Sequence, residues 1–315
     1  MPKRVVVESP ARLHFGVVNP FNNEYRLYVS AGVAISRPKT RVVTYPDRGL
    51  HIEGCRSEEL LKRLEPLIDV LKLKKGHVIV EECAPAHVGL GSTTQLLLSA
   101  ARALLITNEI TNVSMIDIAK LLKLGRVSGV GTYVHMYGGF VVDAGRKRQT
   151  DFPKLLLRLP FPEEWRFVVI IPKGKGLDEH LEYQIFRTAK PAAPEVVWRA
   201  SFMLLHELVP AIIEQDFDAF SKALSELQRT VGLMFREYQG GIFAHYSNVA
   251  IDALLSAGVV GVGQSSWGPA VYGVVRGAER AHSIASSIKA LLSDSEVFVA
   301  DPDNRGAVVK IELVD

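Results

Sequence analysis

The alternation of apolar and polar positions predicts a first half in which strands and helices are mixed. Apolar residues at helical spacing predict a helix over 57–73, in which Pro66 allows a kink. A second helix is expected to begin after the glycine pair Gly89 and Gly91. Runs of β-branched and aromatic residues predict strands over 4–7, 27–35, 41–45 and 77–82.

The second half shows longer amphipathic helices between short apolar runs. Helices are expected over 216–235, 248–257 and 281–292, and strands over 167–171, 271–275 and 309–313. Between the halves, residues 146–158 are charged and contain proline, which places a domain boundary there. We therefore expect an α+β protein with domains 1–155 and 156–315, the second made of helices on one face of an antiparallel sheet.

Composition narrows the class of protein. With 315 residues, 48% hydrophobic and 23% charged, the chain has enough apolar material for a core and is not disordered. A net charge of +3 is too small to indicate binding to nucleic acid or to an anionic membrane. The uncharged stretch 253–275 is long enough to span a bilayer, but its glycines and Pro269 favour loops between soluble elements.

The two cysteines, Cys55 and Cys83, provide neither a disulfide framework nor the spacing of a zinc site. No signal peptide precedes the first Val-rich strand. Together these features predict a protein of the reducing cytoplasm.

The segment Pro85 to Thr94 is the strongest candidate for chemistry. It holds two glycines between a strand and a helix, where backbone N–H groups and hydroxyls attract phosphate. It is not a Walker A loop, because no lysine follows the glycines, and Thr94 stands where the dinucleotide fingerprint needs a third glycine. The alternative is a simple turn with Ser92 as the helix N-cap.

Two further glycine clusters, 128–132 and 261–268, suggest that several loops share one cleft, although each could be an ordinary turn. Trp267 could stack on an aromatic ligand or cover the core. On an extended segment, Arg12 and His14 would project from the same face, one to bind an anion and the other to move a proton. The alternative is a surface arginine and a satisfied histidine.

Taken together, these motifs resemble the superfamily of galactokinase, homoserine kinase, mevalonate kinase and phosphomevalonate kinase over essentially the whole chain. This resemblance implies an N-terminal domain with a ribosomal-protein-like, β-rich fold and a ferredoxin-like C-terminal domain. Within the superfamily, the chain is most similar to the archaeal β-ribofuranosylaminobenzene 5'-phosphate synthases. That narrower similarity rests on the strings 11–16, 87–96, 128–133, 138–143 and, above all, 263–269.

One departure from the kinases supports the narrower resemblance. The middle motif of those kinases carries an aspartate after Ser-Gly-x, which acts as the base or electrostatic anchor for the hydroxyl that accepts the phosphoryl group. This chain has Gly131 at that position. Asp143 follows at the end of a predicted strand and is interpreted as structural. An ATP-dependent small-molecule kinase and a non-catalytic ligand-binding regulator remain the alternative functions.

The synthase resemblance implies that phosphoribosyl diphosphate reacts with 4-hydroxybenzoate or 4-aminobenzoate, releasing carbon dioxide and diphosphate during the biosynthesis of methanopterin-type cofactors. It implies Mg²⁺ bound with the diphosphate, no use of ATP, and a homodimer. Tyr133 is an alternative to Trp267 for stacking on the ring. The catalytic candidates are Arg12, His14, Arg26 and Trp267. The binding candidates are His87, Gly89, Leu90, Gly91, Ser92, Thr93, Thr94, Arg126, Ser128, Gly129, Thr132, Gln264, Ser265 and Ser266, with Ser92 also a metal candidate.

Overall fold

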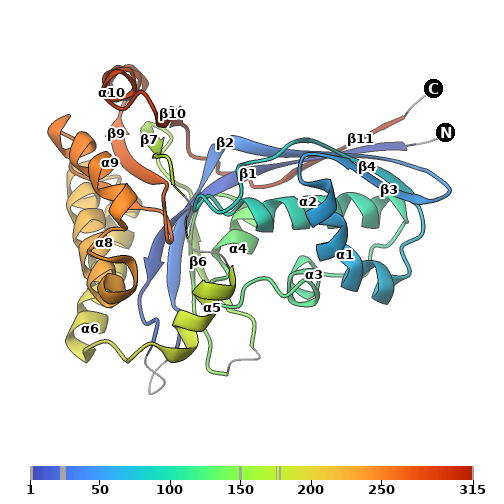
Figure 1. Cartoon of the computed structure of the whole chain (residues 1–315), viewed down its shortest axis with the longest axis horizontal. Helices are drawn as coiled ribbons and strands as arrows, with labels where there is room; N and C mark the ends of the chain where they lie inside the picture. Colours follow the sequence, from blue (N-terminus) through green and yellow to red (C-terminus); the bar gives the residue numbers. More distant parts are fainter. Residues whose placement is uncertain (1–2, 22–25, 149–150, 175, 177–178, 314–315) are drawn as a thin grey trace.

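The computed structural model describes residues 3–21, 26–148, 151–174, 176 and 179–313. These residues form two β-sheets with helices packed on each, and the two long strands β1 and β2 reach from one part of the molecule into the other (Figure 1). This arrangement confirms the expected α+β class.

The first sheet has seven strands. They are β1 (Lys3–Val17), β2 (Ser30–Tyr45), β3 (Leu50–Gly54), β4 (Gly76–Glu82), β5 (Phe140–Asp143), β6 (Leu155–Leu159) and β11 (Val308–Leu313). Their order is β11-β1-β2-β4-β3, and β5 joins β2 to β6. Among the paired strands of the described residues, β3 and β4 form the one parallel pair. The last strand of the chain thus completes the sheet that the first strand begins.

Four helices pack beneath this sheet in Figure 1. They are α1 (Ser57–Leu71), α2 (Ser92–Thr107), α3 (Met115–Leu121) and α4 (Val130–Tyr137). Helix α1 continues through Pro66. The hydroxyl of Ser114 caps α3 by accepting the N–H of Asp117. Helix α2 is buried along most of its length, so its N-terminus is held firmly against β1.

A shift of register in β1 decides which side chains meet α2. Between Ser9 and Ala11 the pairing with β2 slips. Before the slip, Ser9 contacts α2 by a hydrogen bond with Ser99, whereas after it Arg12 contacts the loop that precedes α2. Before the slip, Val5 and Val7 pack in the core that includes α2, whereas after it Ala11 and Leu13 pack in the other core, so the even-numbered side chains take the α2 side. Arg12 and His14 therefore face the same side.

The second sheet is antiparallel, with the order β10-β7-β9-β8. It comprises β7 (Trp165–Ile171), β8 (Val262–Gln264), β9 (Val271–Arg276) and β10 (Glu296–Ala300). Helices α9 (His245–Ser256) and α10 (Ala278–Leu291) pack on the face bearing Val168 and Ile170. Helix α8 (Phe217–Gln239) packs on the opposite face, which bears Phe167 and Val169. The prediction of helices on one face only is thus corrected, because the apolar stripe of α8 fills the space between the two sheets.

Helices α5 (Glu179–Thr188), α6 (Pro194–Phe202) and α7 (Val209–Glu214) and the π-helical turn η1 (Met203–Leu208) lead to α8. The run Pro194–Glu214 is apolar and long enough to cross a membrane by length and composition alone. It packs against α8 in the structure. The stretch 253–275, in contrast, is divided among α9, β8 and β9, as expected from its glycines.

One expectation about the cysteines is wrong. Cys55 and Cys83 form a disulfide, with 6.2 Å between their Cα atoms. Each lies just beyond the end of one of the parallel neighbours β3 and β4. Their proximity therefore arises from strand pairing, which the separation of 28 residues does not reveal.

Candidate functional site

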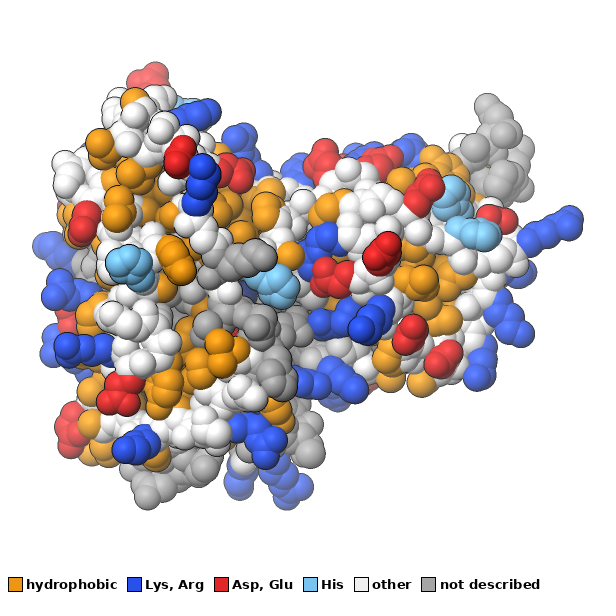
Figure 2. Space-filling view, viewed as in Figure 1, with side chains coloured by type: hydrophobic (Ala, Val, Ile, Leu, Met, Phe, Trp, Pro, Cys, Tyr) orange, Lys and Arg blue, Asp and Glu red, His pale blue; other side chains and the backbone are white. Residues whose placement is uncertain are grey.

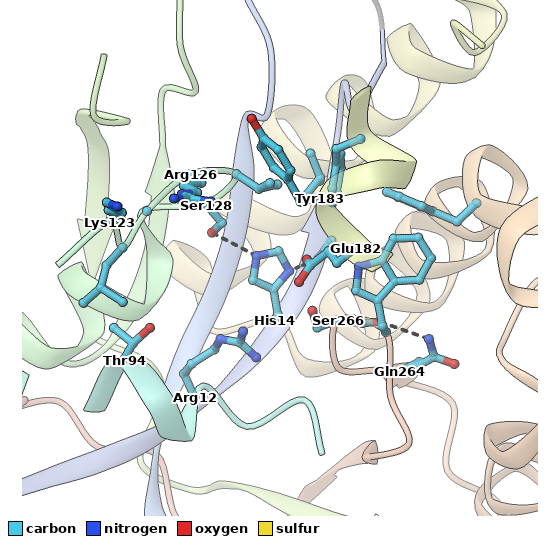
Figure 3. A pocket seen from close by; sticks show the side chains of 18 of the residues that line it. Arg12, His14, Thr94, Lys123, Arg126, Ser128, Glu182, Tyr183, Gln264 and Ser266 are labelled. Atoms are coloured by element: carbon cyan, nitrogen blue, oxygen red, sulfur yellow. Dashed lines mark hydrogen bonds between the residues drawn. The ribbon is translucent and has the colours of Figure 1, made fainter. Parts of the chain in front are cut away.

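A pocket of about 520 Å³ lies where β1 meets α2, α5, α8 and the loop after β8 (Figure 3). One part of its wall is basic and the other is aromatic and apolar. The basic side chains are Arg12, Lys62, Arg63, Lys123 and Arg126. The aromatic wall includes Tyr183, Phe186, Phe235, Phe243 and Trp267, together with Val231; further apolar residues line the pocket, some of them beside the basic side chains. Figure 2 shows Lys and Arg side chains gathered where the two parts of the molecule meet.

Arg12 lines the pocket and is hydrogen-bonded to the first glycine cluster, at Gly89 and Leu90. Its Nη1 donates to the carbonyl of Gly89 at 2.5 Å, and its backbone N–H donates to Leu90 at 3.1 Å. A Cβ added to Gly91, where φ is +72°, would lie 2.8 Å from the Arg12 side chain, so glycine permits this contact. Burial lowers the pKa of Arg12 to about 10, which leaves the side chain cationic at neutral pH.

The three glycine clusters converge, as the sequence suggests. The hydroxyl of Ser265 donates to the Gly89 carbonyl at 2.6 Å and accepts the backbone N–H of His14 at 2.9 Å. A Cβ on Gly89 would lie only 2.3 Å from the Ser265 carbonyl oxygen. His14 in turn contacts Ser128 of the middle cluster. The opening strand is therefore the element that holds all three loops together.

The N-terminus of α2 differs in detail from the prediction. Gly91, not Ser92, is the N-cap residue. Arg56 donates to the hydroxyls of Ser92 at 3.1 Å and Thr93 at 2.8 Å, although no sequence motif singles this arginine out. Arg56 is also paired with Glu59. Of the three hydroxyl residues at this terminus, only Thr94 lines the pocket.

A row of four polar side chains runs inward from the pocket; we call His14, Ser128, Ser30 and Asp143 the buried polar row. His14 Nε2 lies 3.0 Å from Ser128 Oγ, Ser128 Oγ lies 2.7 Å from Ser30 Oγ, and Ser30 Oγ lies 2.5 Å from Asp143 Oδ2. Burial, followed by the charge of Arg12, lowers the pKa of His14 well below its usual value. Burial also raises the pKa of Asp143 to about 6, against the opposing effect of its hydrogen-bond donors.

Trp267 forms part of the aromatic wall. Its ring meets Phe235 edge-on at 4.9 Å between centroids and Phe186 at 6.1 Å. Gln264 holds the loop in place, because its Nε2 donates to the Ser266 carbonyl at 3.0 Å and its Oε1 accepts the N–H of Ala244 at 2.7 Å. The indole is half-buried, so part of its surface faces the pocket.

Several predicted residues lie away from the pocket wall. Arg26 is exposed, and its Nε donates to the carbonyl of Ala144 at 2.8 Å, so the structure does not bring this catalytic candidate to the site. His87 is exposed as well. Thr132 and Tyr133 are buried in α4, where the Tyr133 hydroxyl donates to Pro153 at 2.7 Å. These four side chains do not line the pocket.

Local sequence patterns do not predict most of the aromatic wall. Phe186 and Phe235 belong to helices whose apolar spacing looks like ordinary core packing. Lys62 and Arg63 lie on α1, among other charged residues of an amphipathic helix. No local sequence pattern distinguishes these four pocket residues from ordinary core or solvent-exposed helix positions. They reach the pocket because α1, α5 and α8 pack around β1.

Candidate metal ligands are not clustered in the described part of the chain. Within the described ranges, no group of three or more His, Cys, Asp or Glu residues could hold a metal ion. The hydroxyl of Ser92 is occupied by the guanidinium of Arg56, which would repel a cation. Glu65 and Glu182 are the carboxylates among the residues that line the pocket.

Comparisons with known proteins agree with this architecture. Residues 208–294 match the family described as GHMP kinases C terminal. Homoserine kinase from Listeria monocytogenes has a TM-score of 0.69 at 17% identity, over 97% of this chain and 99% of that one. Mevalonate diphosphate decarboxylase from Enterococcus faecalis has a TM-score of 0.64 at 16% identity, over 98% and 99%. At these identities the two structures establish the fold, which is the expected two-domain GHMP kinase fold.

Sequence relatives identify the family more narrowly. A β-ribofuranosylphenol 5'-phosphate synthase from Methanothermobacter thermautotrophicus is 31% identical over 96% of this chain and 98% of its own length. A protein of the same name from Archaeoglobus fulgidus is 26% identical over 97% and 99%. With this identity over nearly the full length of both chains, the protein belongs to the β-ribofuranosylphenol 5'-phosphate synthase family of the GHMP kinase superfamily.

Proposed function

We propose that the protein condenses phosphoribosyl diphosphate with a para-substituted benzoate, releasing carbon dioxide and diphosphate and forming a C-riboside 5'-phosphate for a methanopterin-type cofactor. The relatives are named for a ribofuranosylphenol product. A phenol product favours 4-hydroxybenzoate over 4-aminobenzoate as the acceptor.

The observation that carries this proposal is the division of one pocket into a basic and an aromatic wall. Guanidinium and ammonium groups bind phosphate and neutralise a departing diphosphate. An aromatic wall orients a flat ring by edge and face contacts. A single cavity with both walls can hold an anionic sugar donor and an aromatic acid side by side. Binding both reactants in a fixed orientation lowers the entropic cost of bringing them together.

The bond changes balance without a further reactant. The ring carbon that bears the carboxylate attacks the anomeric carbon, and the bond from that carbon to the diphosphate breaks with the electron pair leaving on diphosphate. The bond to the carboxylate then breaks, its electron pair restores the aromatic ring, and carbon dioxide departs. Arg12 and the basic side chains around it would stabilise the leaving group.

Mg²⁺ is proposed to enter with the diphosphate. Mg²⁺ commonly keeps several waters and is held by substrate phosphates together with one or two carboxylates. Such binding does not need a protein metal cage, and Glu182 is a carboxylate within the pocket. We also propose a homodimer in the cytoplasm.

A kinase remains the second enzymatic possibility. At Gly131, where the kinases carry an aspartate, a Cβ would lie 3.2 Å from Thr94 Cγ2, and the Gly131 carbonyl accepts from Gln95 Nε2 at 2.9 Å. This close packing leaves little room for a carboxylate beside Thr94. The absence of an acidic side chain at that position favours the synthase.

The decisive assay uses purified protein, phosphoribosyl diphosphate, Mg²⁺ and carboxyl-labelled 4-hydroxybenzoate. Release of labelled carbon dioxide without ATP supports the synthase. Turnover of ATP with a small alcohol and no release of label would identify a kinase, and ligand binding with neither reaction would identify a regulator.

Trp267→Ala tests the aromatic wall in the same assay. Loss of the ring contacts should raise the KM for the benzoate by about tenfold, since an aromatic pair contributes roughly 0.5–1.5 kcal/mol beyond its buried area. Trp198→Ala is the matched control, because Trp198 is 56% exposed and lies outside the pocket. Equal kinetics for the two variants would place the acceptor elsewhere.

A further inference from the structure

The loop that joins α3 to α4 (residues 122–129, the α3–α4 loop) forms a continuous part of the pocket wall. Its successive residues 123–128 all line the pocket. Lys123, with φ +57°, and Gly125, with φ +68°, both turn the chain through the left-handed region. The N–H of Leu124 donates to the carbonyl of Ala119 at 2.8 Å. The loop therefore folds back on the end of α3 and then runs along the pocket.

Two cations of this loop have no counter-ion among the described residues. Lys123 and Arg126 are exposed and form no ion pair or hydrogen bond with a carboxylate of the described part of the chain. Lys120, one turn earlier, is paired with Asp117 at 3.5 Å. The guanidinium of Arg126 lies over the ring of Tyr183, 5.4 Å from its centroid. The ring attracts the charge without using a hydrogen-bond donor, so the N–H groups of Arg126 stay available to an oxygen ligand.

Backbone donors accompany these cations. The N–H groups of residues 125–128 donate to no acceptor within the described segments, which leaves them to solvent or to a ligand. Backbone N–H groups and cationic side chains together supply the charge-assisted hydrogen bonds that hold phosphate oxygens in proteins. The α3–α4 loop thus has the donors for one phosphate group.

The loop is fixed in place by contacts behind the pocket. A Cβ on Gly125 would lie 2.3 Å from the ring of Phe152, so glycine permits this close packing. The carbonyl of Gly125 accepts a hydrogen bond from the guanidinium of Arg146. Ser128 belongs to the buried polar row, and its Oγ lies 2.7 Å from Ser30 Oγ. A site whose backbone is already ordered loses little conformational entropy when it binds a ligand.

Arg12 occupies a different end of the pocket. Its Nη1 lies 2.5 Å from the Gly89 carbonyl oxygen and 3.5 Å from Ser265 Oγ, in the loop that carries Trp267. Glu182 of α5 interacts with Arg12. Figure 3 shows Lys123 and Arg126 apart from Arg12. The pocket therefore has two basic ends, and the end at Arg12 is the one beside Trp267.

The proposed sugar donor is anionic at both ends, with diphosphate on C1 and a phosphate on C5 of the ribose. The reaction requires C1 to face the aromatic acceptor. Since the aromatic Trp267 loop adjoins Arg12, the diphosphate on C1 fits the Arg12 end. Glu182, the carboxylate suggested above for Mg²⁺, also interacts with that end. The phosphate on C5 is then left for the opposite end.

We propose that the α3–α4 loop is the subsite for the 5'-phosphate of the sugar donor. Lys123, Arg126 and the N–H groups of residues 125–128 hold this phosphate, while Arg12 meets the diphosphate. This inference rests on the proposed function and assigns each end of the donor to one end of the pocket. Two separate anion subsites orient the sugar, because a donor bound the wrong way round would place C1 away from the acceptor.

Simultaneous binding tests whether the subsites are separate. Ribose 5-phosphate carries the 5'-phosphate alone, and magnesium diphosphate carries the leaving group alone. In calorimetric titrations of the wild-type protein, saturation with magnesium diphosphate should change the Kd of ribose 5-phosphate by less than about threefold. A Kd that rises in proportion to the diphosphate concentration would mean one shared site and would overturn the assignment. No measurable binding of ribose 5-phosphate would overturn it as well.

Arg126→Ala tests the position of the subsite. This variant should weaken ribose 5-phosphate binding by about tenfold or more, since it removes charge-assisted hydrogen bonds, and should leave the Kd of diphosphate within about twofold. Arg126→Lys keeps the charge and should restore only part of the affinity. Lys120→Ala is the matched control, because it removes an equal charge from an exposed residue outside the pocket. Equal weakening of both ligands by Arg126→Ala would indicate general electrostatic attraction and would overturn the subsite.

Kinetics separates this inference from the proposed function. Arg126→Ala should raise the KM for phosphoribosyl diphosphate by about tenfold and leave the KM for 4-hydroxybenzoate unchanged. If the wild-type protein releases no carbon dioxide, the proposed reaction is wrong, whereas ribose 5-phosphate binding and its dependence on Arg126 still decide the subsite. Unchanged binding of ribose 5-phosphate to Arg126→Ala would overturn the subsite even if carbon dioxide is released. Circular dichroism and melting temperatures confirm that the compared variants are folded.

Discussion

Two buried histidines have a similar titration but occupy different surroundings. Burial lowers the pKa of His14 well below its usual value and that of His135 to about 3, and in each case a nearby arginine adds to the effect. His14 lines a pocket and leads through serines to Asp143. His135 is enclosed in the core, where Nδ1 meets Gln95 Oε1 at 3.1 Å and Nε2 has no hydrogen-bond partner among the described residues. A lowered pKa therefore reports burial in both cases, and access to the pocket is what distinguishes His14 from His135.

The largest expected effect is a loss of turnover when His14 is replaced, in contrast to His135. His14→Gln should lower kcat/KM by on the order of 10-fold, because His14 lines the pocket and a displaced side chain there misplaces the bound substrates. Its melting temperature should change little, since glutamine can keep the contact with Ser128. Steady-state kinetics with labelled 4-hydroxybenzoate checks this. A loss smaller than about threefold would place His14 in the same class as His135.

The pH dependence of turnover should follow the buried polar row. Asp143 accepts the hydrogen bonds of Ser30, Gly129 and Gly145 most strongly when it is ionised, and burial raises its pKa to about 6. The rate should therefore be constant above that value and fall about tenfold per pH unit below it, as the carboxylate becomes protonated. In Asp143→Asn this acid limb should vanish. A wild-type profile that is flat from pH 5 to 8 would contradict the assignment.

The stability of the fold should depend on pH through His135. Its folded pKa of about 3 lies below the unfolded value, so the unfolded chain binds a proton that the folded protein cannot bind. Stability is therefore lost as pH falls from about 6.5 toward 3, by up to about 1.4 kcal/mol per pH unit from this group. Urea unfolding at pH 7, 5 and 4 should show a shallower loss for His135→Gln than for the wild type. Asp143, whose folded pKa is raised, has the opposite sign between about pH 4 and 6.

The smallest expected effect is the change in turnover when His135 is replaced. His135→Gln should leave kcat at pH 7.5 within about twofold of the wild type, because no described route links this side chain to the pocket. A loss as large as that of His14→Gln would show that the core site communicates with the reaction.

Local patterns predicted the parts of the site that depend on neighbouring residues. The strand, glycine turn and helix around Gly91 follow from periodicity and turn chemistry. The common face of Arg12 and His14 follows from the two-residue repeat of a strand. Asp143 was correctly expected at the end of a strand, but its partners Ser30 and Ser128 are 113 and 15 residues away in the sequence.

The remaining features depend on tertiary pairing. No local pattern places the slip between Ser9 and Ala11, yet it decides which β1 side chains reach the pocket. Arg26 resembles Arg12 only in its charge. It is exposed and donates to the carbonyl of Ala144, and it does not line the pocket. Phe186 and Phe235 became part of the site only because α5 and α8 pack beside β1.

The return of β11 to β1 has a consequence for biosynthesis. Six residues of β11, from Val308 to Leu313, pair with β1 residues from the very beginning of the chain. During translation, the edge of β1 therefore stays without this neighbour until some three hundred later residues, up to β11, have left the ribosome. Arg12 and His14 belong to that same strand, so the strand that carries them gains its outer neighbour only after residues 308–313 have been made.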